Sequence, residues 1–286
     1  QFAMADVIKI KKGLDLKLNG VAELVYGQVA QSETYGFVPD DFHGLVPKPA
    51  LKPGDAVKVG TVLFTDKNHP EIKVVSPVSG ELLAVNRGER RKILDIVIKN
   101  DGKMEQADIA PVKADATAEE MKEGLSNAGM LAFIKQRPYD VIANPSDTPR
   151  AIFISTFDKA PLAPDYDFIF KDEQSDFQSG VDALSKIAPV YVGVAKGNTS
   201  FAHLRATQVT CFDGKYPVSN VGVQINHVAP INKGEIVWTI GAQEVVYIGR
   251  YVSKGKLDFT RTVALTGDHA IHCAYYKMLP GTPYQS

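Results

Sequence analysis

Val57-Lys58-Val59-Gly60-Thr61-Val62-Leu63-Phe64 and Lys73-Val74-Val75-Ser76-Pro77-Val78-Ser79-Gly80-Glu81-Leu82 are the stretches that decide the fold of the first part of the chain. Both are short, alternating and bounded by Gly, Pro and Asp, which is the spacing of strands joined by tight turns. They lie on either side of residues 66–70 as a weak internal repeat, which is typical of two interlocking β-layers. With Ile93–Ile98 as the closing strand, the sequence predicts a barrel-sandwich hybrid domain, biotinyl- or lipoyl-like, over residues 4–110.

Lys67 lies near the turn between the two repeats, where carrier domains display a lysine for biotin or lipoate. Asp66-Lys67 imitates the lipoyl Asp-Lys pair, but Asn68-His69-Pro70 follows, whereas Met residues surround a biotinyl lysine. A modifying ligase reads shape and flanking residues together, so a motif without its context is a hypothesis only. We therefore favour a solvated turn lysine, and a prosthetic-group carrier stays an alternative.

From Pro111 onward the pattern changes to that of an α/β domain. Thr117 and Glu120 have the spacing of a capping box, and Gly129 stands where the following helix would end. The apolar runs 151–154 and 190–194 read as strands, and residues 207–212 add a third. Between the first two, apolar residues recur at helical spacing: Phe177, Val181, Leu184 and Ile187.

The predicted fold is therefore α+β and multidomain. The barrel-sandwich hybrid is followed by a Rossmann-like α/β domain over residues 111–256, with a mostly parallel sheet covered by helices. The alternating run 257–265 then suggests a further small β domain over residues 257–286, which would be truncated.

Composition excludes several classes of function. The 32 basic and 33 acidic residues give a formal net charge of −1, so the chain lacks the basic footprint of a nucleic-acid binder. No apolar window has the length of a membrane span, and residues 4–9 lack the apolar region of a signal peptide. Cys211 and Cys273 are the only cysteines, so we expect neither a disulfide framework nor an iron–sulfur centre.

Standard cofactor and catalytic motifs are also missing. No G-x-G-x-x-G or Walker sequence occurs, and the nearest candidate, residues 193–197, has wrongly spaced glycines. His269, His272 and Cys273 lack a fourth ligand in view, so we expect no metal site and leave their role open. There is no G-x-S-x-G, and we predict no catalytic residue.

Two stretches combine aromatic and small residues with a cation, Glu33–Pro39 and Phe133–Tyr139. Flat apolar rings beside a hydrogen-bond donor suit a quinone headgroup, which is aromatic-like with two carbonyl acceptors. Ordinary packing between domains explains the same residues equally well. The candidate quinone-binding residues are Tyr35, Phe37, Phe133, Lys135, Arg137 and Tyr139.

Several blocks in order carry a resemblance to a known family, among them Ile8–Leu16, Phe64–Lys67, Ser76–Gly80, Asn86–Arg91, Pro145–Pro149, Val237–Ile240 and Arg261–Gly267. They resemble the A subunit of the sodium-translocating NADH:quinone reductase over residues 7–267, and we expect an N-terminal fragment lacking the family's C-terminal region. The resemblance implies a peripheral subunit on the cytoplasmic face of the inner membrane, not catalytic alone. It would contribute to quinone binding and complex assembly, with other subunits, especially membrane subunits, as partners and quinone as substrate.

That family is similar in architecture to the flavin-binding subunit of respiratory complex I and to the C subunit of the Rnf complex. Those relatives carry a loop of the form G-x-G-G-A-G-F-P-T, where this chain has Ala128-Gly129-Met130-Leu131-Ala132-Phe133-Ile134-Lys135-Gln136-Arg137-Pro138. Bulky side chains would fill the space in which backbone approaches a flavin phosphate. The resemblance thus implies a degenerate nucleotide site, with flavins and iron–sulfur centres in partner subunits. A purely structural adaptor is the other alternative.

Overall fold

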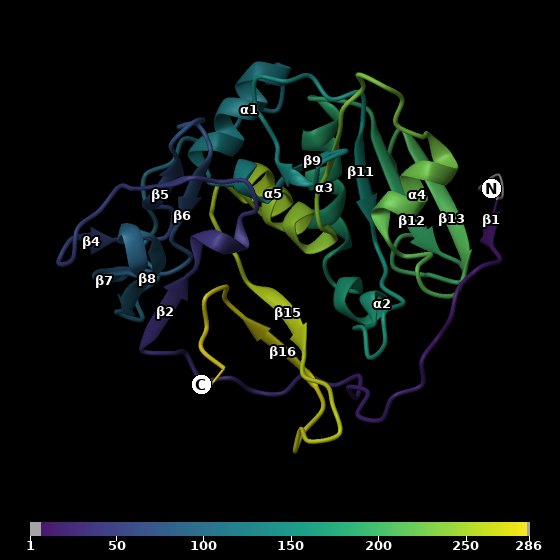
Figure 1. Cartoon of the computed structure of the whole chain (residues 1–286), viewed down its shortest axis with the longest axis horizontal. Helices are drawn as coiled ribbons and strands as arrows, with labels where there is room; N and C mark the ends of the chain where they lie inside the picture. The colour runs from purple at the N-terminus through teal and green to yellow at the C-terminus, as the bar shows by residue number, and fades with distance from the viewer. Residues whose placement is uncertain (1–6, 285–286) are drawn as a thin grey trace. The chain divides into compact units, whose positions relative to one another are not determined.

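The computed structural model describes residues 7–284 and contains two compact units (Figure 1). Unit 1 comprises the residues up to 28 together with 149–249 and 262–277. Unit 2 comprises residues 29–148, 250–261 and those from 278 on. Each unit is therefore drawn from separate stretches of the chain, in contrast to the contiguous ranges 4–110, 111–256 and 257–286 predicted from the sequence.

Unit 2 contains two small antiparallel sheets. The first has the order β2 (Thr34–Phe37), β8 (Ile93–Asn100), β7 (Gly80–Arg87) and β4 (Ala56–Val57). The second has the order β3 (Pro47–Pro49), β5 (Val62–Asp66) and β6 (Lys73–Val75). One buried apolar cluster, which includes Tyr35, Phe64 and Ile98, joins residues of both sheets. Gly80 is required where β7 begins, because a Cβ there would lie 1.8 Å from the carbonyl oxygen of Lys99.

The rest of unit 2 begins with α1 (Ala118–Asn127), and its predicted capping box is confirmed. The Thr117 hydroxyl accepts from the Glu120 amide at 3.2 Å, and the Glu120 carboxylate accepts from the Thr117 amide at 2.8 Å. Gly129, with a φ of +72°, follows the helix as the sequence predicts. The short elements η3 (Leu131–Phe133), β9 (Lys135–Arg137) and β10 (Val141–Ile142) come next.

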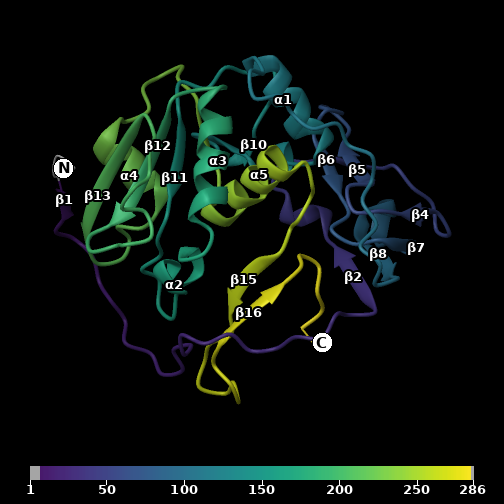
Figure 2. The same ribbon diagram turned by 180° about the vertical axis from the view of Figure 1, so that it is seen from behind.

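Unit 1 is built on parallel strands in the order β1 (Val7–Ile10), β13 (Gln208–Gly214), β12 (Val190–Ala195), β11 (Ile152–Ser155) and β14 (Val237–Thr239). The predicted strand, helix and strand over 151–194 are confirmed as β11, α3 (Gln174–Ser185) and β12. Helix α4 (Val221–Val228) covers one face of the sheet and α3 covers the other (Figures 1 and 2). The remaining elements are α2 (Tyr166–Phe170), α5 (Ala242–Lys254), β15 (Arg261–Ala264) and β16 (Tyr275–Met278).

The position of β1 differs from the sequence prediction, which grouped residues 7–10 with the β-domain. Val7 to Ile10 pair in parallel with Cys211 to Gly214 at the edge of the unit 1 sheet. The reason is apolar contact, because Ile8 and Ile10 pack against the buried cluster of Phe157, Phe212 and Val218. Residues 11–27, which we call the strap, then cross unit 1 and hydrogen-bond β16 through Gly27 and Tyr275.

Within residues 7–284, the structure contains no helix of the length and apolar character needed to traverse a bilayer.

Candidate functional site

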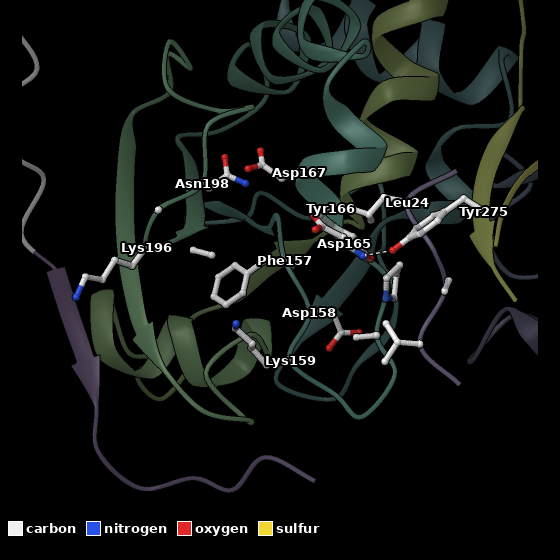
Figure 3. Close-up of a pocket in the computed structure, with 16 residues that line it drawn as sticks. Leu24, Phe157, Asp158, Lys159, Asp165, Tyr166, Asp167, Lys196, Asn198 and Tyr275 are labelled. Carbon is white, nitrogen blue, oxygen red and sulfur yellow. Dashed lines mark hydrogen bonds between the residues drawn. The ribbon is translucent and has the colours of Figure 1, made fainter. Parts of the chain in front are cut away.

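Unit 1 contains a cleft of about 490 Å³ at the carboxyl ends of β11 and β12 (Figure 3). Its walls come from the segment after β11, the turn after β12, the start of α2, the strap and β16. The chain proceeds from β11 outward through β12 to β13 and then returns to β14 on the other side of β11. In open parallel sheets, the crevice outside the carboxyl ends of the strands near such a reversal is where ligands bind.

Local hydrogen bonds explain why the segment after β11 turns into the cleft wall. The Thr156 hydroxyl donates to the Gly193 carbonyl at 2.8 Å, which fixes the chain beside β12. Asp158 then accepts from the Ala160 amide at 2.8 Å, a turn that places Phe157 and Lys159 at the cleft. On the neighbouring strand, Gly197 adopts a φ of +81° and reverses the chain after β12.

The start of α2 is fixed by two carboxylates. Asp165 caps the helix by accepting from the Phe168 amide at 3.1 Å. Asp167 accepts from the Ser200 amide at 2.7 Å and from the Thr199 amide and hydroxyl at 3.2 and 3.1 Å. Partial burial raises the pKa of Asp167, but the hydrogen bonds from Ser200 and Thr199 outweigh it and leave the pKa below its ordinary value. Asp167 is thus an ionised structural clamp.

Tyr275 brings a buried hydroxyl to the same cleft. Only 2% of this residue is exposed, and its hydroxyl accepts from the Asp165 amide at 2.7 Å. Burial is the main reason that the pKa of Tyr275 is raised, so the hydroxyl keeps its proton at neutral pH. No acceptor for that proton occurs among the side chains and carbonyls of residues 7–284, so the O–H is available as a donor.

Lys159 is the second available donor. Its side chain has no hydrogen-bond or ion-pair partner in the described part of the chain, and Figure 3 shows it beside Phe157. Lys196 differs, because its ammonium lies 3.2 Å from Asp213 and points away from the cleft (Figure 3). Lys159 and Tyr275 therefore approach the cleft from different elements, each with a free hydrogen-bond donor.

The charge and polarity of the lining restrict the ligand. Asp158, Asp165 and Asp167 contribute three carboxylates against the single unpaired ammonium of Lys159, so the cleft disfavours phosphates. Apolar walls come from Phe157, Val21, Leu24, Ala163 and Pro164. Elsewhere in residues 7–284, as here, no three His, Cys, Asp or Glu side chains are grouped to hold a metal ion. A neutral molecule with an apolar body and hydrogen-bond acceptors fits this combination.

Two of the six residues predicted to bind quinone meet in unit 2. Phe37 and Phe133 line the same apolar pocket with Phe42 and Phe259, and the ring centroids of Phe133 and Phe259 are 6.3 Å apart. This pocket measures about 50 Å³, whereas pockets that enclose drug-sized ligands measure about 300–1,000 Å³. Tyr35 is 2% exposed inside the sandwich core.

The other three predicted residues surround Asp140. Lys135 and Arg137 lie 3.9 and 3.3 Å from its carboxylate oxygens. Tyr139, next to Asp140, is 82% exposed. The six residues therefore do not line one common cavity. Sequence reasoning missed Lys159 and Tyr275, although the strand ends at 155 and 195 are the signal that could have directed attention to this edge of the sheet.

Two other sequence motifs are resolved as local structure. Lys67 is exposed directly after β5, and its amide donates to the Val46 carbonyl at 2.8 Å, so it lies in a turn as predicted. His269 contacts its neighbour Asp268 at 2.7 Å, whereas the Cys273 thiol donates to the Gly267 carbonyl at 3.4 Å.

The segment 128–138 does not fit a flavin phosphate. A Cβ on Gly129 would lie 2.6 Å from a methyl carbon of Val75, so a side chain already occupies the space beside this single glycine. Backbone amides cannot line an anion there without displacing Val75.

The fold and the comparisons together define a class of protein, in which a barrel-sandwich hybrid is followed by an α/β domain. Residues 8–101 match the model of the NqrA N-terminal barrel-sandwich hybrid domain, and residues 116–257 match that of the NqrA second alpha/beta domain. The chain belongs to the NqrA family. This confirms the barrel-sandwich hybrid and the α/β domain predicted from the sequence.

Curated relatives carry the name of the A subunit of the Na(+)-translocating NADH-quinone reductase. The protein of Alcanivorax borkumensis is 32% identical over 271 residues, 92% of this chain. That of Pseudomonas aeruginosa is 32% identical over 266 residues, and that of Hahella chejuensis is 35% identical over 271 residues, each 91% of this chain. The chain spans about 60% of the length of these relatives.

Proposed function

We propose that the chain is a peripheral subunit of a sodium-translocating NADH:quinone reductase that contributes to quinone binding and assembly. The name of its relatives supports membership in this oxidoreductase. Its partners are the other subunits, especially those in the membrane, and its location is the cytoplasmic face of the inner membrane. The observation that carries quinone binding is the unit 1 cleft, which joins apolar walls to two free donors.

In this proposal the quinone ring lies beside Phe157, and the Lys159 ammonium and the Tyr275 hydroxyl donate to its carbonyl oxygens. The cleft volume of about 490 Å³ is that of a small-molecule site. A neutral ring also avoids repulsion by Asp158, Asp165 and Asp167, which line the cleft. Donors that strengthen as negative charge develops on the carbonyl oxygens would favour the reduced quinone.

The aromatic–cation stretches are the second candidate location for the same quinone. Phe37 and Phe133 share an apolar pocket, and exposed Tyr139 is close in sequence to Lys135 and Arg137. Tyr35 would act only by supporting Phe37, since both lie in the sandwich core. The small volume of the pocket, about 50 Å³, makes this the weaker location unless its walls move.

We propose further that this chain holds no flavin or iron–sulfur centre, and that these reside in partner subunits. The contact between Gly129 and Val75 supports the absence of a flavin site, and the presence of only two cysteines supports the absence of a cluster. The strand order around β11 supports a Rossmann-like origin shared with the flavin subunit of complex I. A structural adaptor is the alternative if no quinone binds.

Photolabelling tests the site directly. The purified chain is illuminated with an azido-quinone, digested and analysed by mass spectrometry, with excess unlabelled quinone as competitor. We expect competed label on peptides that contain Phe157–Tyr166 or Tyr275. Label confined to peptides with Phe133 or Tyr139 would move the site to the second location. Absence of competed label from both would reject quinone binding by this chain.

Two substitutions test the donors. Tyr275→Phe removes one neutral hydrogen bond and should weaken quinone binding about fivefold, and Lys159→Met should weaken it about tenfold, because hydrogen bonds from charged groups are stronger. Lys52→Met is the matched control, an exposed lysine of unit 2. Equal affinities for Lys159→Met and Lys52→Met would contradict the assignment.

A further inference from the structure

The strap exposes large apolar side chains that the fold does not cover. Leu14, Leu16 and Leu18 are 64%, 57% and 53% exposed, and Val21 and Leu24 are 65% and 55% exposed. Single exposed apolar residues are ordinary, but a continuous run of them marks an interaction surface. Figure 1 shows the strap as an open purple trace that leaves β1 and reaches the β15–β16 hairpin.

The strap backbone is held in place, so these side chains are presented rather than loose. The Leu14 amide donates to the Tyr216 carbonyl at 3.0 Å, and the Gly267 amide donates to the Gly20 carbonyl at 2.9 Å. The Glu23 amide donates to the Cys273 carbonyl at 2.9 Å. The loop 267–273 that receives and makes these bonds carries Ile271, which is 90% exposed. A second apolar residue thus lies on the loop that anchors the strap.

Basic residues are interspersed with the leucines. Lys9, Lys11, Lys12 and Lys17 are exposed in residues 9–18, where Asp15 is the one acidic residue. The Asp15 carboxylate accepts from the Tyr216 amide at 3.3 Å and is held against unit 1. Residues 9–18 therefore carry a formal charge of +3, four lysines less one aspartate, in a chain whose net charge is −1.

We propose that residues 9–18 and Ile271 dock on the surface of an anionic lipid bilayer. Leucines on such a segment enter the boundary between headgroups and acyl chains, and lysines beside them contact the anionic headgroups. Lysine alternating with leucine suits this boundary, because the long side chain reaches outward while its methylenes stay apolar. The buried core of a protein interface is instead depleted of lysine, which disfavours a protein partner on this segment.

The inference does not depend on quinone binding, since it rests on the exposed side chains and charge of the strap. Val21 and Leu24, further along the strap, line the unit 1 cleft. Docking of residues 9–18 would consequently bring a wall of that cleft close to the lipid surface.

Vesicle sedimentation of the whole chain tests the proposal. We expect binding to vesicles of phosphatidylglycerol and phosphatidylcholine, no binding to pure phosphatidylcholine, and weaker binding when salt rises from about 0.05 to about 0.5 M. The triple variant Lys11→Gln, Lys12→Gln, Lys17→Gln should lose on the order of 100-fold in affinity, about fivefold for each lysine. The triple variant Leu14→Asn, Leu16→Asn, Leu18→Asn should lose about tenfold or more.

Matched controls lie on unit 2. Leu83→Asn with Leu94→Asn changes two leucines that are 50% and 47% exposed, and Lys52→Gln with Lys103→Gln changes two exposed lysines. These variants should bind vesicles like the wild type. Trp238 fluorescence verifies folding, and hydrogen exchange on the unmodified chain should show protection of residues 11–20 on anionic vesicles alone.

Several results would overturn the proposal. One is absence of binding to anionic vesicles, and another is equal weakening by strap and control variants. A third is exchange protection elsewhere in the chain with none in residues 11–20. Self-association that the leucine variant abolishes, without vesicle binding, would assign the strap to a second copy of the chain instead.

Discussion

Asp167 stabilises unit 1 through the ionised form of its carboxylate. Its folded-state pKa is depressed because the hydrogen bonds from Ser200 and Thr199 outweigh the effect of burial. A depressed pKa means that the stabilisation is fully present above the unfolded-state value of about 3.8 and is lost as pH falls through the lower folded-state value. The clamp between α2 and the turn after β12 should therefore weaken only in acid.

Asp167→Asn tests this assignment. Hydrogen bonds to a charged acceptor are worth about 1.5–3 kcal/mol, so the variant should lose about 1–2 kcal/mol of unfolding free energy at neutral pH. Urea unfolding at several pH values should show a smaller loss of stability below pH of about 4 in the variant than in the wild type. Asp172→Asn, an exposed carboxylate nearby, should change neither quantity. A variant with the full acid dependence of the wild type would contradict the clamp.

Single residues also show what sequence reasoning can recover. Thr117 and Glu120 were predictable as a capping box because both partners lie three residues apart on one chain segment. Tyr275 was not predictable, because its hydroxyl meets the amide of Asp165, 110 residues earlier, through tertiary packing. Lys159 likewise acquires meaning only from the strand end before it and the walls around it.

Helices α3 and α5 approach each other closely through glycines in unit 1. A Cβ on Gly180 of α3 would lie 2.1 Å from the Val245 carbonyl oxygen of α5. A Cβ on Gly249 of α5 would lie 1.6 Å from the Asp176 carbonyl oxygen of α3. Because these neighbours are backbone atoms, the contact can be relieved only by moving a helix. Glycine at both positions is thus a requirement of packing.

Gly180→Ala should consequently destabilise the protein. Alanine favours a helix over glycine by up to about 1 kcal/mol, but forcing the helices apart typically costs about 1–3 kcal/mol. We expect a net loss of about 1–2 kcal/mol in urea unfolding. Ser175→Ala, at an exposed position of α3, should stay within about 0.5 kcal/mol of the wild type. A gain of stability in Gly180→Ala would mean that the helices separate freely.

Elements were predictable where the pattern is local. The runs at 151–154 and 190–194 are strands because they are continuous, apolar and β-branched, and their parallel pairing follows from the helix between them. The strand at residues 7–10 was predicted in the wrong context, since alternation predicts a strand but not its partner. The strap has no periodic pattern at all, and its exposure depends on what the rest of the fold leaves uncovered.

At the scale of the whole molecule, the first residues of the chain complete a unit formed mainly by its second half. β1 covers the edge of β13 and contributes Ile8 and Ile10 to the cluster with Phe157 and Phe212. An uncovered edge strand exposes unpaired amides and carbonyls and favours aggregation. The α/β unit should therefore depend on residues that precede the barrel-sandwich hybrid in sequence.

Trp238, the single tryptophan, is fully buried in β14 and reports on the folding of unit 1. Ile8→Asn places a polar amide against the apolar cluster, so the urea midpoint followed by Trp238 fluorescence should fall, with a loss of about 2–3 kcal/mol. Lys9→Asn changes the neighbouring side chain, which is exposed, and should leave that midpoint unchanged. If residues 7–10 packed instead within the β-domain, neither variant would move the Trp238 transition. A selective effect of Ile8→Asn therefore tests both the pairing of β1 and its register, because a shift of one residue would exchange the behaviour of the two variants.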